Sequence, residues 1–237
     1  MKNGKKYTAI ILAAGSGSRM HSAVPKQYMK IKGYPLIYYS LKAFEDSGAD
    51  QVVLVTAEKD ISFCTTEIVE KYNLKKVSAV VAGGEERYLS VYEGLKAAGQ
   101  TDYVLIHDGA RPLLDVNMIE TAMETVEKER ACVFAVPVKD TIKIADQNGY
   151  AIGTPERSTL WAVQTPQSFS YPMIMEAYHL LFDAQEKGEI IPVITDDAML
   201  VEQMTGQKVK LISGKYENLK VTTPEDMEIA ELFLHRN

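Results

Sequence analysis

The chain has 237 residues, enough for one large domain with a substantial hydrophobic core. Hydrophobic residues make up 46% and charged residues 24%, and the 15 glycines and 9 prolines are spread along the chain, which excludes the collagen-like, disordered and coiled-coil classes. The formal net charge of -6 at pH 7 gives a field that repels polyanions, so we expect no nucleic-acid partner and place any phosphate site in a local basic cluster.

The N-terminal segment allows two interpretations. Three lysines precede the apolar run 7–14, as in a secretory signal peptide. That run continues directly into a glycine-rich loop and is far too short to span a bilayer, so we favour a buried strand, a cytoplasmic protein and no membrane partner. Cys64 and Cys132 lack a metal-ligand spacing and are too few for a disulfide framework, which also favours a reducing compartment.

In chain order, short apolar runs rich in Val and Ile alternate with amphipathic patterns. The apolar runs predict buried strands over 8–13, 51–56, 77–82, 103–107, 132–138 and 209–212. Helical faces are predicted from Ile37 to Gly48, over 61–72, 88–98 and 116–128, and in a final helix after Thr223. The alternation predicts an α/β fold, a Rossmann-like three-layer sandwich with a mainly parallel sheet and ligands beyond the carboxyl ends of its strands.

One stretch interrupts this alternation. Apolar residues alternate on both sides of Asn148-Gly149, a strong signal for a two-residue hairpin turn. The pattern predicts a projecting β-hairpin arm, residues 139–157, inserted in a single domain of residues 1–237. Because an exposed hairpin with apolar alternation needs a cover, we expect a homodimer in which a second subunit supplies it.

The first predicted strand leads into a loop, residues 13–20, that reads AAGSGSRM. Glycines at a strand end let backbone N–H groups approach phosphate oxygens, and Arg19 and Lys26 add the positive charge that a triphosphate needs. The loop has neither the third glycine of the dinucleotide fingerprint nor the Gly-Lys-Ser/Thr ending of a P-loop, which argues against hydride transfer. A tight turn with two solvated cations is the alternative interpretation.

A second cluster, residues 107–112, follows the strand 103–107 and reads HDGARP. Asp108 is well placed to ligate Mg²⁺, which takes carboxylate and phosphate oxygens together and keeps several waters. Triphosphate chemistry needs this charge neutralisation. The alternative is an Asp that caps the next turn and pairs with Arg111. We expect His107 to be a hydrogen-bonded residue at a strand end rather than a catalyst.

A third cluster is the glycine turn at Gly83-Gly84, again between a strand and a helix. It suits close backbone contact with a base or a ribose, although the signal is weak by itself. Lys220 precedes the final helix and can reach the same crevice; the alternative is a solvated charge.

Together these segments resemble the cytidylyltransferases that make cytidine-diphosphate sugar alcohols, most closely the methylerythritol phosphate family of the non-mevalonate isoprenoid pathway. The resemblance extends from Ala9 to Leu234. As an ordered set, its carriers are residues 12–17, 19, 25–27, 83–90, 107–112, 138–143, 160–169, 195–196 and 220–226.

The resemblance implies a role for each matching residue. CTP would be held by Ala13, Ala14, Gly15, Gly84, Glu85 and Ser90. The catalytic cations at its phosphates would be Arg19, Lys26 and Lys220, and the Mg²⁺ ligand would be Asp108. The acceptor would lie among Thr141, Arg157, Thr165, Thr195 and Arg111, the first two on or beside the arm. Glu85 departs from the family pattern, which commonly has Asp there.

The implied reaction is cytidylyl transfer from CTP to 2-C-methyl-D-erythritol 4-phosphate, with release of pyrophosphate. A phosphate monoester carries nearly two negative charges at pH 7, so it can attack the α-phosphorus without a general base. This agrees with a sequence whose four histidines are scattered and fit no Ser-His-Asp or Cys-His pattern.

Two alternatives stay open at this point. A ribitol 5-phosphate cytidylyltransferase would have the same chemistry and a different acceptor, although the segment 160–167 looks more like the isoprenoid enzyme. A non-catalytic nucleotide-sensing module could use the same fold. The sensing module is disfavoured by the joint presence of Arg19, Lys26, Asp108 and Lys220.

Overall fold

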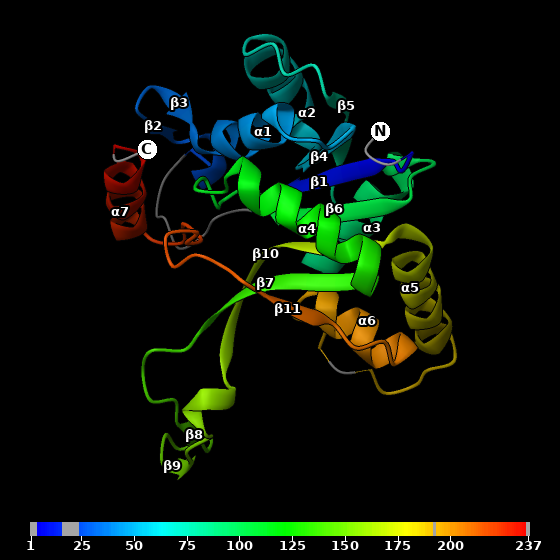
Figure 1. The fold of residues 1–237 in the computed structure, drawn as a ribbon, viewed down its shortest axis with the longest axis vertical. Coiled ribbons are helices and arrows are strands. Elements are labelled where there is room, and N and C mark those ends of the chain that lie inside the picture. Colours follow the sequence, from blue (N-terminus) through cyan, green and yellow to red (C-terminus); the bar gives the residue numbers. More distant parts are fainter. Residues whose placement is uncertain (1–3, 16–23, 192, 236–237) are drawn as a thin grey trace.

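The computed structural model describes residues 4–15, 24–191 and 193–235. Within these residues the central sheet has seven strands in the order β11-β7-β10-β6-β1-β4-β5 (Figure 1). Its strands are β1 (Tyr7–Ala13), β4 (Gln51–Thr56), β5 (Val77–Ala82), β6 (Tyr103–Asp108), β7 (Ala131–Pro137), β10 (Trp161–Ser170) and β11 (Lys210–Ser213). Strand β10 runs antiparallel to β6 and β7, whereas the other pairings are parallel. The predicted mainly parallel sheet is confirmed.

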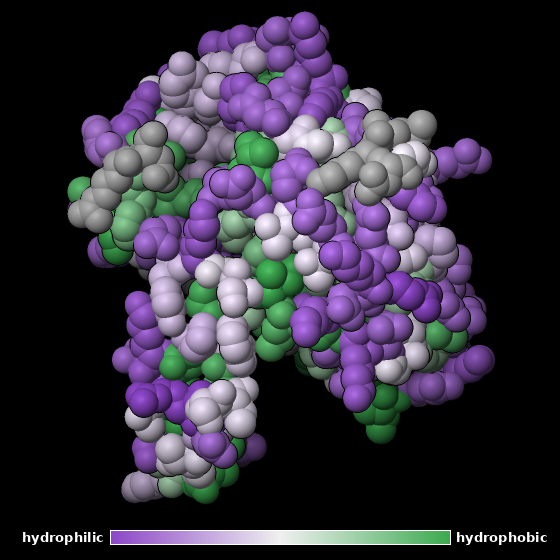
Figure 2. Space-filling model, viewed as in Figure 1, coloured by the Kyte–Doolittle hydropathy of each residue, from purple (hydrophilic) through white to green (hydrophobic). Residues whose placement is uncertain are grey.

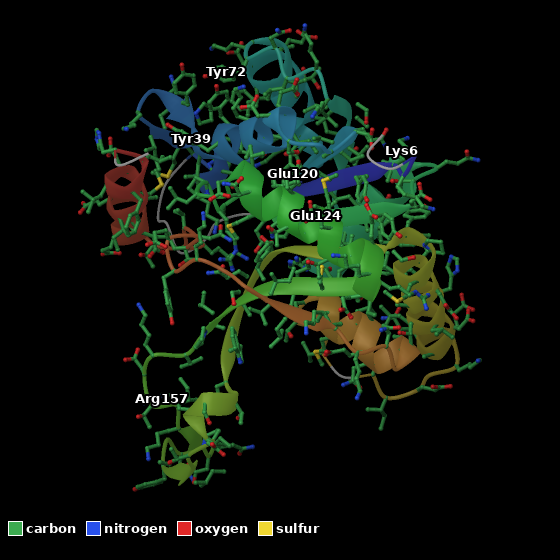
Figure 3. The ribbon with its side chains drawn as sticks, in the orientation of Figure 1. Lys6, Tyr39, Tyr72, Glu120, Glu124 and Arg157 are labelled. Carbon is green, nitrogen blue, oxygen red and sulfur yellow. The ribbon has the colours of Figure 1, made fainter. Side chains whose placement is uncertain are left out.

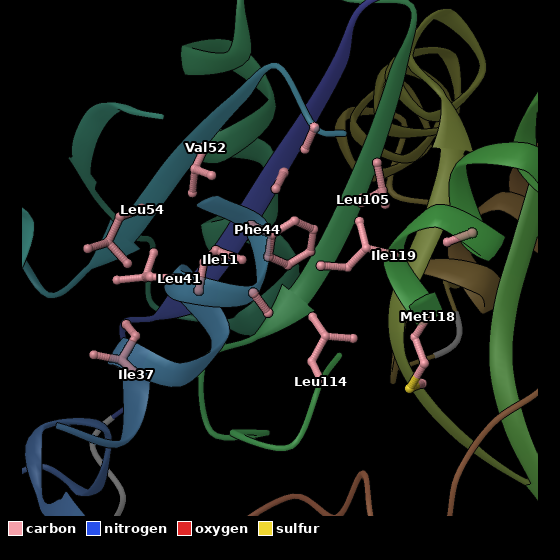
Figure 4. Close-up of a cluster of buried hydrophobic side chains, with 14 of the residues drawn as sticks. Ile11, Ile37, Leu41, Phe44, Val52, Leu54, Leu105, Leu114, Met118 and Ile119 are labelled. Carbon is pink, nitrogen blue, oxygen red and sulfur yellow. The ribbon is translucent and has the colours of Figure 1, made fainter. Parts of the chain in front are cut away.

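Helices cover both faces of this sheet. They are α1 (Leu36–Asp46), α2 (Ile61–Phe63, continued by a π-helix over Cys64–Glu70), α3 (Arg87–Ala98), α4 (Val116–Glu129), α5 (Tyr171–Glu186), α6 (Asp197–Thr205) and α7 (Pro224–Leu234). Along β1, Ile11 faces a core under α1 and α4, and Ile10 faces a second core under α3, α5 and α6. Figure 4 shows the first core, with Phe44 of α1 and Ile119 of α4. Successive side chains of a strand point to opposite faces of the sheet, so each face packs against its own layer of helices and the fold has three layers.

The order of the sheet also locates a crevice. The chain passes from β1 to β4 and β5 on one side, then crosses back to β6 on the other side of β1. In open α/β sheets, ligands bind beyond the carboxyl ends of the strands at such a reversal. Here those ends lead to Gly15 and Asp108. Helix α7, which has the predicted capping box at Thr223 and Asp226, closes a small core next to the crevice.

The arm is a separate hairpin of β8 (Ile144–Ala145) and β9 (Ala151–Gly153), and it projects away from the body (Figure 1). Its turn lies at the predicted place, but the predicted two-residue length is wrong. The N–H of Asp146 donates to the carbonyl of Tyr150 over 2.9 Å, so three residues lie between them, with Gly149 at a φ of 85°. A left-handed glycine near the end of a three-residue loop is a common hairpin geometry.

Several elements have no counterpart in the predictions. These are β10, α5, α6 and a short hairpin of β2 (Lys30–Ile31) and β3 (Tyr34–Pro35). The first strand is central and buried, as expected, and both cysteines are free and buried. None of the helices in the described ranges is long and apolar enough to cross a membrane.

Candidate active site

Two cavities lie at the carboxyl ends of β1 and β6. We call the first, of about 230 Å³, the glycine-loop cavity; it is lined by Leu12, Ala13, Ala14, Gly15, Lys26, Gln27, Gly84, Glu85, Glu86, Ser90 and Ala110. We call the second, of about 170 Å³, the β10 cavity; it is lined by Arg111, Val163, Gln164, Thr165, Gln167, Thr195 and Asp196. Three further side chains, Arg87, Asp108 and Lys220, line both cavities. The two cavities therefore adjoin at these three charged groups.

Close approach of two loops shapes the glycine-loop cavity. A Cβ atom on Gly83 would lie 2.7 Å from the Cβ of Ala14 and 2.6 Å from the Oγ of Ser90, closer than real Cβ atoms come. The turn after β5 therefore needs glycine at this position. The Oγ of Ser90 is 3.2 Å from the carbonyl of Gly84, to which it donates. The predicted nucleotide residues of both glycine segments thus lie around one cavity.

Lys26 and Lys220 reach this cavity from different segments. The Nζ of Lys26 donates to the carbonyl of Val221 over 2.8 Å, and the Nζ of Lys220 lies 2.8 Å from Oδ2 of Asp108. Beside Lys26, the amide of Gln27 donates to the carbonyls of Ala13 and Gly15, at 2.7 and 3.3 Å. The glycine loop and the lysine-bearing turn are therefore tied together.

Asp108 lies in a group of three cations. Besides Lys220, Nε of Arg87 is 3.4 Å from Oδ1, and Nε of Arg111 is 3.9 Å from Oδ2. Burial alone raises the pKa of Asp108, but the charges of Arg87, Lys220 and Arg111 lower it well below its ordinary value. The carboxylate is therefore ionised at neutral pH.

His107 and Thr165 form the scaffold beneath Asp108. The Oγ1 of Thr165 accepts from the backbone N–H of Asp108 at 3.1 Å and lies 2.9 Å from Nδ1 of His107. The other ring nitrogen is 3.2 Å from the carbonyl of Arg111, which can only accept, so Nε2 carries the proton and Nδ1 accepts from Thr165. Burial lowers the pKa of His107 to about 4, so the ring is neutral at pH 7. The prediction of a hydrogen-bonded histidine at a strand end is confirmed.

A cationic side chain with spare hydrogen-bonding capacity lies in the β10 cavity. Nη1 of Arg111 donates to the carbonyl of Asn218 over 2.7 Å, whereas its buried Nε has no hydrogen-bond partner among the described residues. A buried, unpaired N–H is costly and suits an added acceptor. Thr165 and Thr195 line the same cavity. Three of the five predicted acceptor residues therefore come together.

The other predicted residues lie elsewhere. Thr141 and Arg157, both described, line neither cavity; Arg157 lies on the arm, far from the body of its own chain (Figure 3). Its Nη1 donates to the carbonyl of Lys139 at 3.1 Å. Arg19 lies outside the described residues.

Sequence reasoning missed several residues that line the crevice, two of which tie its segments together. Gln27 and Arg87 stand inside motifs that were singled out, but no role was assigned to either. A signal for Arg87 was present, since a cation stands three positions after Gly84 at the start of the next helix. Its partner, Asp197, is 110 positions away, and no local pattern connects them.

An α/β sheet with glycine segments, lysines and an ionised Asp at the reversal of its strand order fits the class of nucleotidyltransferases. The comparisons with known proteins agree. Residues 7–236 match the family model described as IspD: 2-C-methyl-D-erythritol 4-phosphate cytidylyltransferase. A relative of that name from Lachnospira eligens is 51% identical over 96% of this chain and 98% of its own length, and one from Lachnoclostridium phytofermentans is 47% identical over 98% of both chains.

A solved structure gives the same result. The crystal structure of 4-diphosphocytidyl-2C-methyl-D-erythritol synthase from Anaerococcus prevotii superposes with a TM-score of 0.82 at 34% identity, over 99% of this chain and 98% of that one. The chain belongs to the 2-C-methyl-D-erythritol 4-phosphate cytidylyltransferase family. It is an enzyme, and the family reaction is CTP-dependent cytidylyl transfer to that acceptor.

Proposed function

We propose that this chain transfers the cytidylyl group of CTP to 2-C-methyl-D-erythritol 4-phosphate across the boundary between its two cavities. The observation that carries the proposal is the ionised carboxylate of Asp108, which lies where the cavities adjoin and is surrounded by cations. CTP occupies the glycine-loop cavity, where Gly84, Glu85 and Ser90 contact its nucleoside. The acceptor phosphate enters the β10 cavity beside Arg111.

The chemistry needs positioning and charge neutralisation rather than proton transfer. An oxygen of the acceptor phosphate forms a bond to the α-phosphorus, and the bond from that phosphorus to the bridging oxygen of the β-phosphate breaks. Pyrophosphate leaves with both bonding electrons. No proton has to be removed from the nucleophile, which suits a site where the buried imidazole of His107 is already hydrogen-bonded on both nitrogens.

The lysines counter the charge that builds up on the α-phosphate. Lys26 is preorganised by its bond to Val221, and Gln27 beside it holds the glycine loop, so this cation is fixed relative to the phosphates. Lys220 exchanges its contact with Asp108 for a phosphate oxygen. Arg19, from the same glycine loop, adds a third cation. The backbone of Ala13, Ala14 and Gly15 lies along the triphosphate.

The donor set fits a magnesium ion. The described residues contain no cluster of three or more His, Cys, Asp or Glu that could hold a metal alone. Asp108 supplies one ionised carboxylate next to the phosphate site, and Mg²⁺ commonly takes one or two carboxylates with substrate phosphates and waters. When bound, it would neutralise phosphate charge and favour departure of pyrophosphate.

The acceptor site draws on a second subunit. Thr165, Thr195 and Arg111 bind the acceptor from one chain, and Thr141 and Arg157 reach it from the arm of the partner in a homodimer. The exposed apolar side chains of the arm support this: Ile142 is 40%, Ile144 51%, Tyr150 72% and Ile152 67% exposed. Full burial of such a side chain contributes about 1.5–3 kcal/mol. The body remains one domain of residues 1–237, the arm over 139–157 is its dimerisation element, and the enzyme works in the cytoplasm.

The decisive experiment measures pyrophosphate release from CTP with each acceptor in turn. We expect turnover with methylerythritol phosphate, loss of turnover when EDTA removes Mg²⁺, and a strong preference over ribitol 5-phosphate. Equal or faster turnover with ribitol 5-phosphate would contradict the acceptor, and CTP binding without turnover of either would favour the sensing module.

A further inference from the structure

Arg87 is the one residue at the junction of the two cavities that has no role so far. It is the first residue of α3 and stands three positions after Gly84 of the glycine turn. Its side chain lines both cavities together with Asp108 and Lys220. The side chain is 30% exposed, so most of it lies within the protein.

The guanidinium of Arg87 is held by two carboxylates. Nη1 and Nη2 donate to the two carboxylate oxygens of Asp197, at 3.0 and 2.9 Å, and Nε lies 3.4 Å from Oδ1 of Asp108. A bidentate contact fixes the plane of a guanidinium as well as its position. Burial lowers the pKa of Arg87, but Asp197 and Asp108 raise it more, so the net shift is upward and the side chain stays charged.

Asp197 is itself fixed. Its side chain is 1% exposed, and it is the first residue of α6. The N–H groups of Asp197 and Ala198 both donate to Oε1 of Gln167 at 3.0 Å, and the amide of Gln167 donates to Asp196 at 3.0 Å. A continuous set of contacts therefore runs from β10 through the start of α6 and Arg87 to Asp108.

The two oxygens of Asp108 have different partners. Oδ2 faces Lys220 and Arg111, while Oδ1 faces Arg87. An incoming triphosphate attracts Lys220, whose flexible stem lets it leave Asp108. Arg87 is already paired with Asp197 and held by the bidentate contact. A move onto the phosphates would therefore lower the free energy less for Arg87 than for Lys220.

We propose that Arg87, anchored by Asp197, is a positioning residue: it keeps the Asp108 carboxylate oriented at the junction of the cavities after Lys220 has moved to the phosphates. The same contact fixes the start of α6, which follows Thr195 of the β10 cavity. The inference rests on the cytidylyl-transfer reaction. Arg87 would thus connect the nucleotide and acceptor halves of the site.

The test must separate this role from that of an ordinary buried ion pair. Loss of one partner leaves an unpaired buried charge and destabilises a fold, whereas replacement of both by apolar residues is often neutral. We therefore compare the double variant Arg87→Met/Asp197→Leu with the single variant Arg87→Lys. Lysine keeps the charge but cannot make the bidentate contact. Val201→Ala, at a buried apolar position one turn after Asp197 in α6, is the control for general destabilisation.

The expected result is a fall in kcat with retained folding. Loss of a partner that orients a ligand commonly costs about 10- to 100-fold, and we expect that loss in both Arg87 variants, with a melting temperature near wild type in the double variant. The affinity for CTP, measured by calorimetry, should change little, because the glycine loop is intact. Val201→Ala should lower the melting temperature and leave kcat near wild type.

Defined results would overturn the proposal. Wild-type kcat in a folded double variant, or losses that follow the melting temperature and appear equally in Val201→Ala, would overturn the proposal. If the double variant does not fold, Arg87→Lys decides: normal kcat overturns the proposal, and reduced kcat with normal CTP affinity supports it. Wild-type turnover in the same assay tests the reaction itself, so its failure is distinguished from failure of the role of Arg87.

Discussion

The crevice and the arm differ in how far their side chains are buried and in what stabilises them. At the crevice, Asp108, Thr165 and Gln167 are 7%, 3% and 2% exposed. Thr165 of β10 is hydrogen-bonded to Asp108 of β6, and Gln167 of β10 is hydrogen-bonded to the start of α6. On the arm, Tyr150, which precedes β9, and Ile152 of β9 are 72% and 67% exposed. Hydrophobic residues lie at the surface of the arm (Figure 2). An isolated two-stranded hairpin is at best marginally stable in water. The crevice is therefore held together by contacts within one chain, whereas the cover that we propose for the arm is a second chain.

The largest effect is expected at the crevice, from Lys26→Ala. Removal of a preorganised cation at the reacting phosphate should lower kcat by about a hundredfold or more, with a smaller effect on the Michaelis constants. Steady-state kinetics with both substrates varied measures this. Lys30→Ala, an exposed lysine four positions further on, is the matched control. A normal kcat with a raised Michaelis constant for CTP would reassign Lys26 to ground-state binding.

A smaller effect, and a different one, is expected on the arm from Ile152→Glu. A charge in place of a side chain worth about 1.5–3 kcal/mol on burial should weaken the dimer about 10- to 100-fold. Analytical ultracentrifugation measures the change, and CTP affinity should stay constant. Ile190→Glu makes the same substitution at a fully exposed position away from the arm. If both variants associate like wild type, the arm does not hold the dimer.

A strand could be predicted from the sequence where its buried residues are apolar, and it was missed where they are polar. The strands around β1 were predictable because their buried residues are mainly apolar. The glycine turns were predictable because glycine marks places of close approach, as Gly83 does beside Ala14. Strand β10 was not, because its buried part is polar: Gln164, Gln167 and Ser168 are at most 6% exposed. A register shift between Val163 and Gln167 interrupts the period further.

Local sequence patterns also limit which site residues could be predicted. Asp108 precedes Gly109 at a strand end, and Lys26 follows the glycine-rich loop 13–20 after a few residues, so local patterns indicated both. The contact of Arg87 with Asp197 joins residues 110 positions apart, and only the tertiary fold brings them together. The arm was predicted by its turn and its apolar alternation, which are local.

The smallest predicted effect concerns the scaffold of the crevice, through Thr165→Val. The substitution leaves the N–H of Asp108 without an acceptor and Nδ1 of His107 without a donor, at a cost of about 1–3 kcal/mol. For a chain of this length each kcal/mol lowers the melting temperature by about 2–4 °C, which calorimetry detects. Thr121→Val, at an exposed hydroxyl of α4, is the control and should change the melting temperature little. Equal shifts in the melting temperatures of the two variants would mean that Thr165 stabilises the fold no more than an exposed threonine does.

The most direct test of the division between crevice and arm uses two inactive variants together. Lys26→Ala and Arg157→Ala proteins are unfolded, mixed in equal amounts and refolded, and native mass spectrometry confirms the mixed dimers. If Arg157 serves the partner's site, about half of the dimers are mixed, each has one intact site, and roughly a quarter of wild-type activity returns. If activity does not exceed the sum of the two variants refolded separately, Arg157 serves its own chain, and the account of a site completed by the arm of a second subunit is wrong.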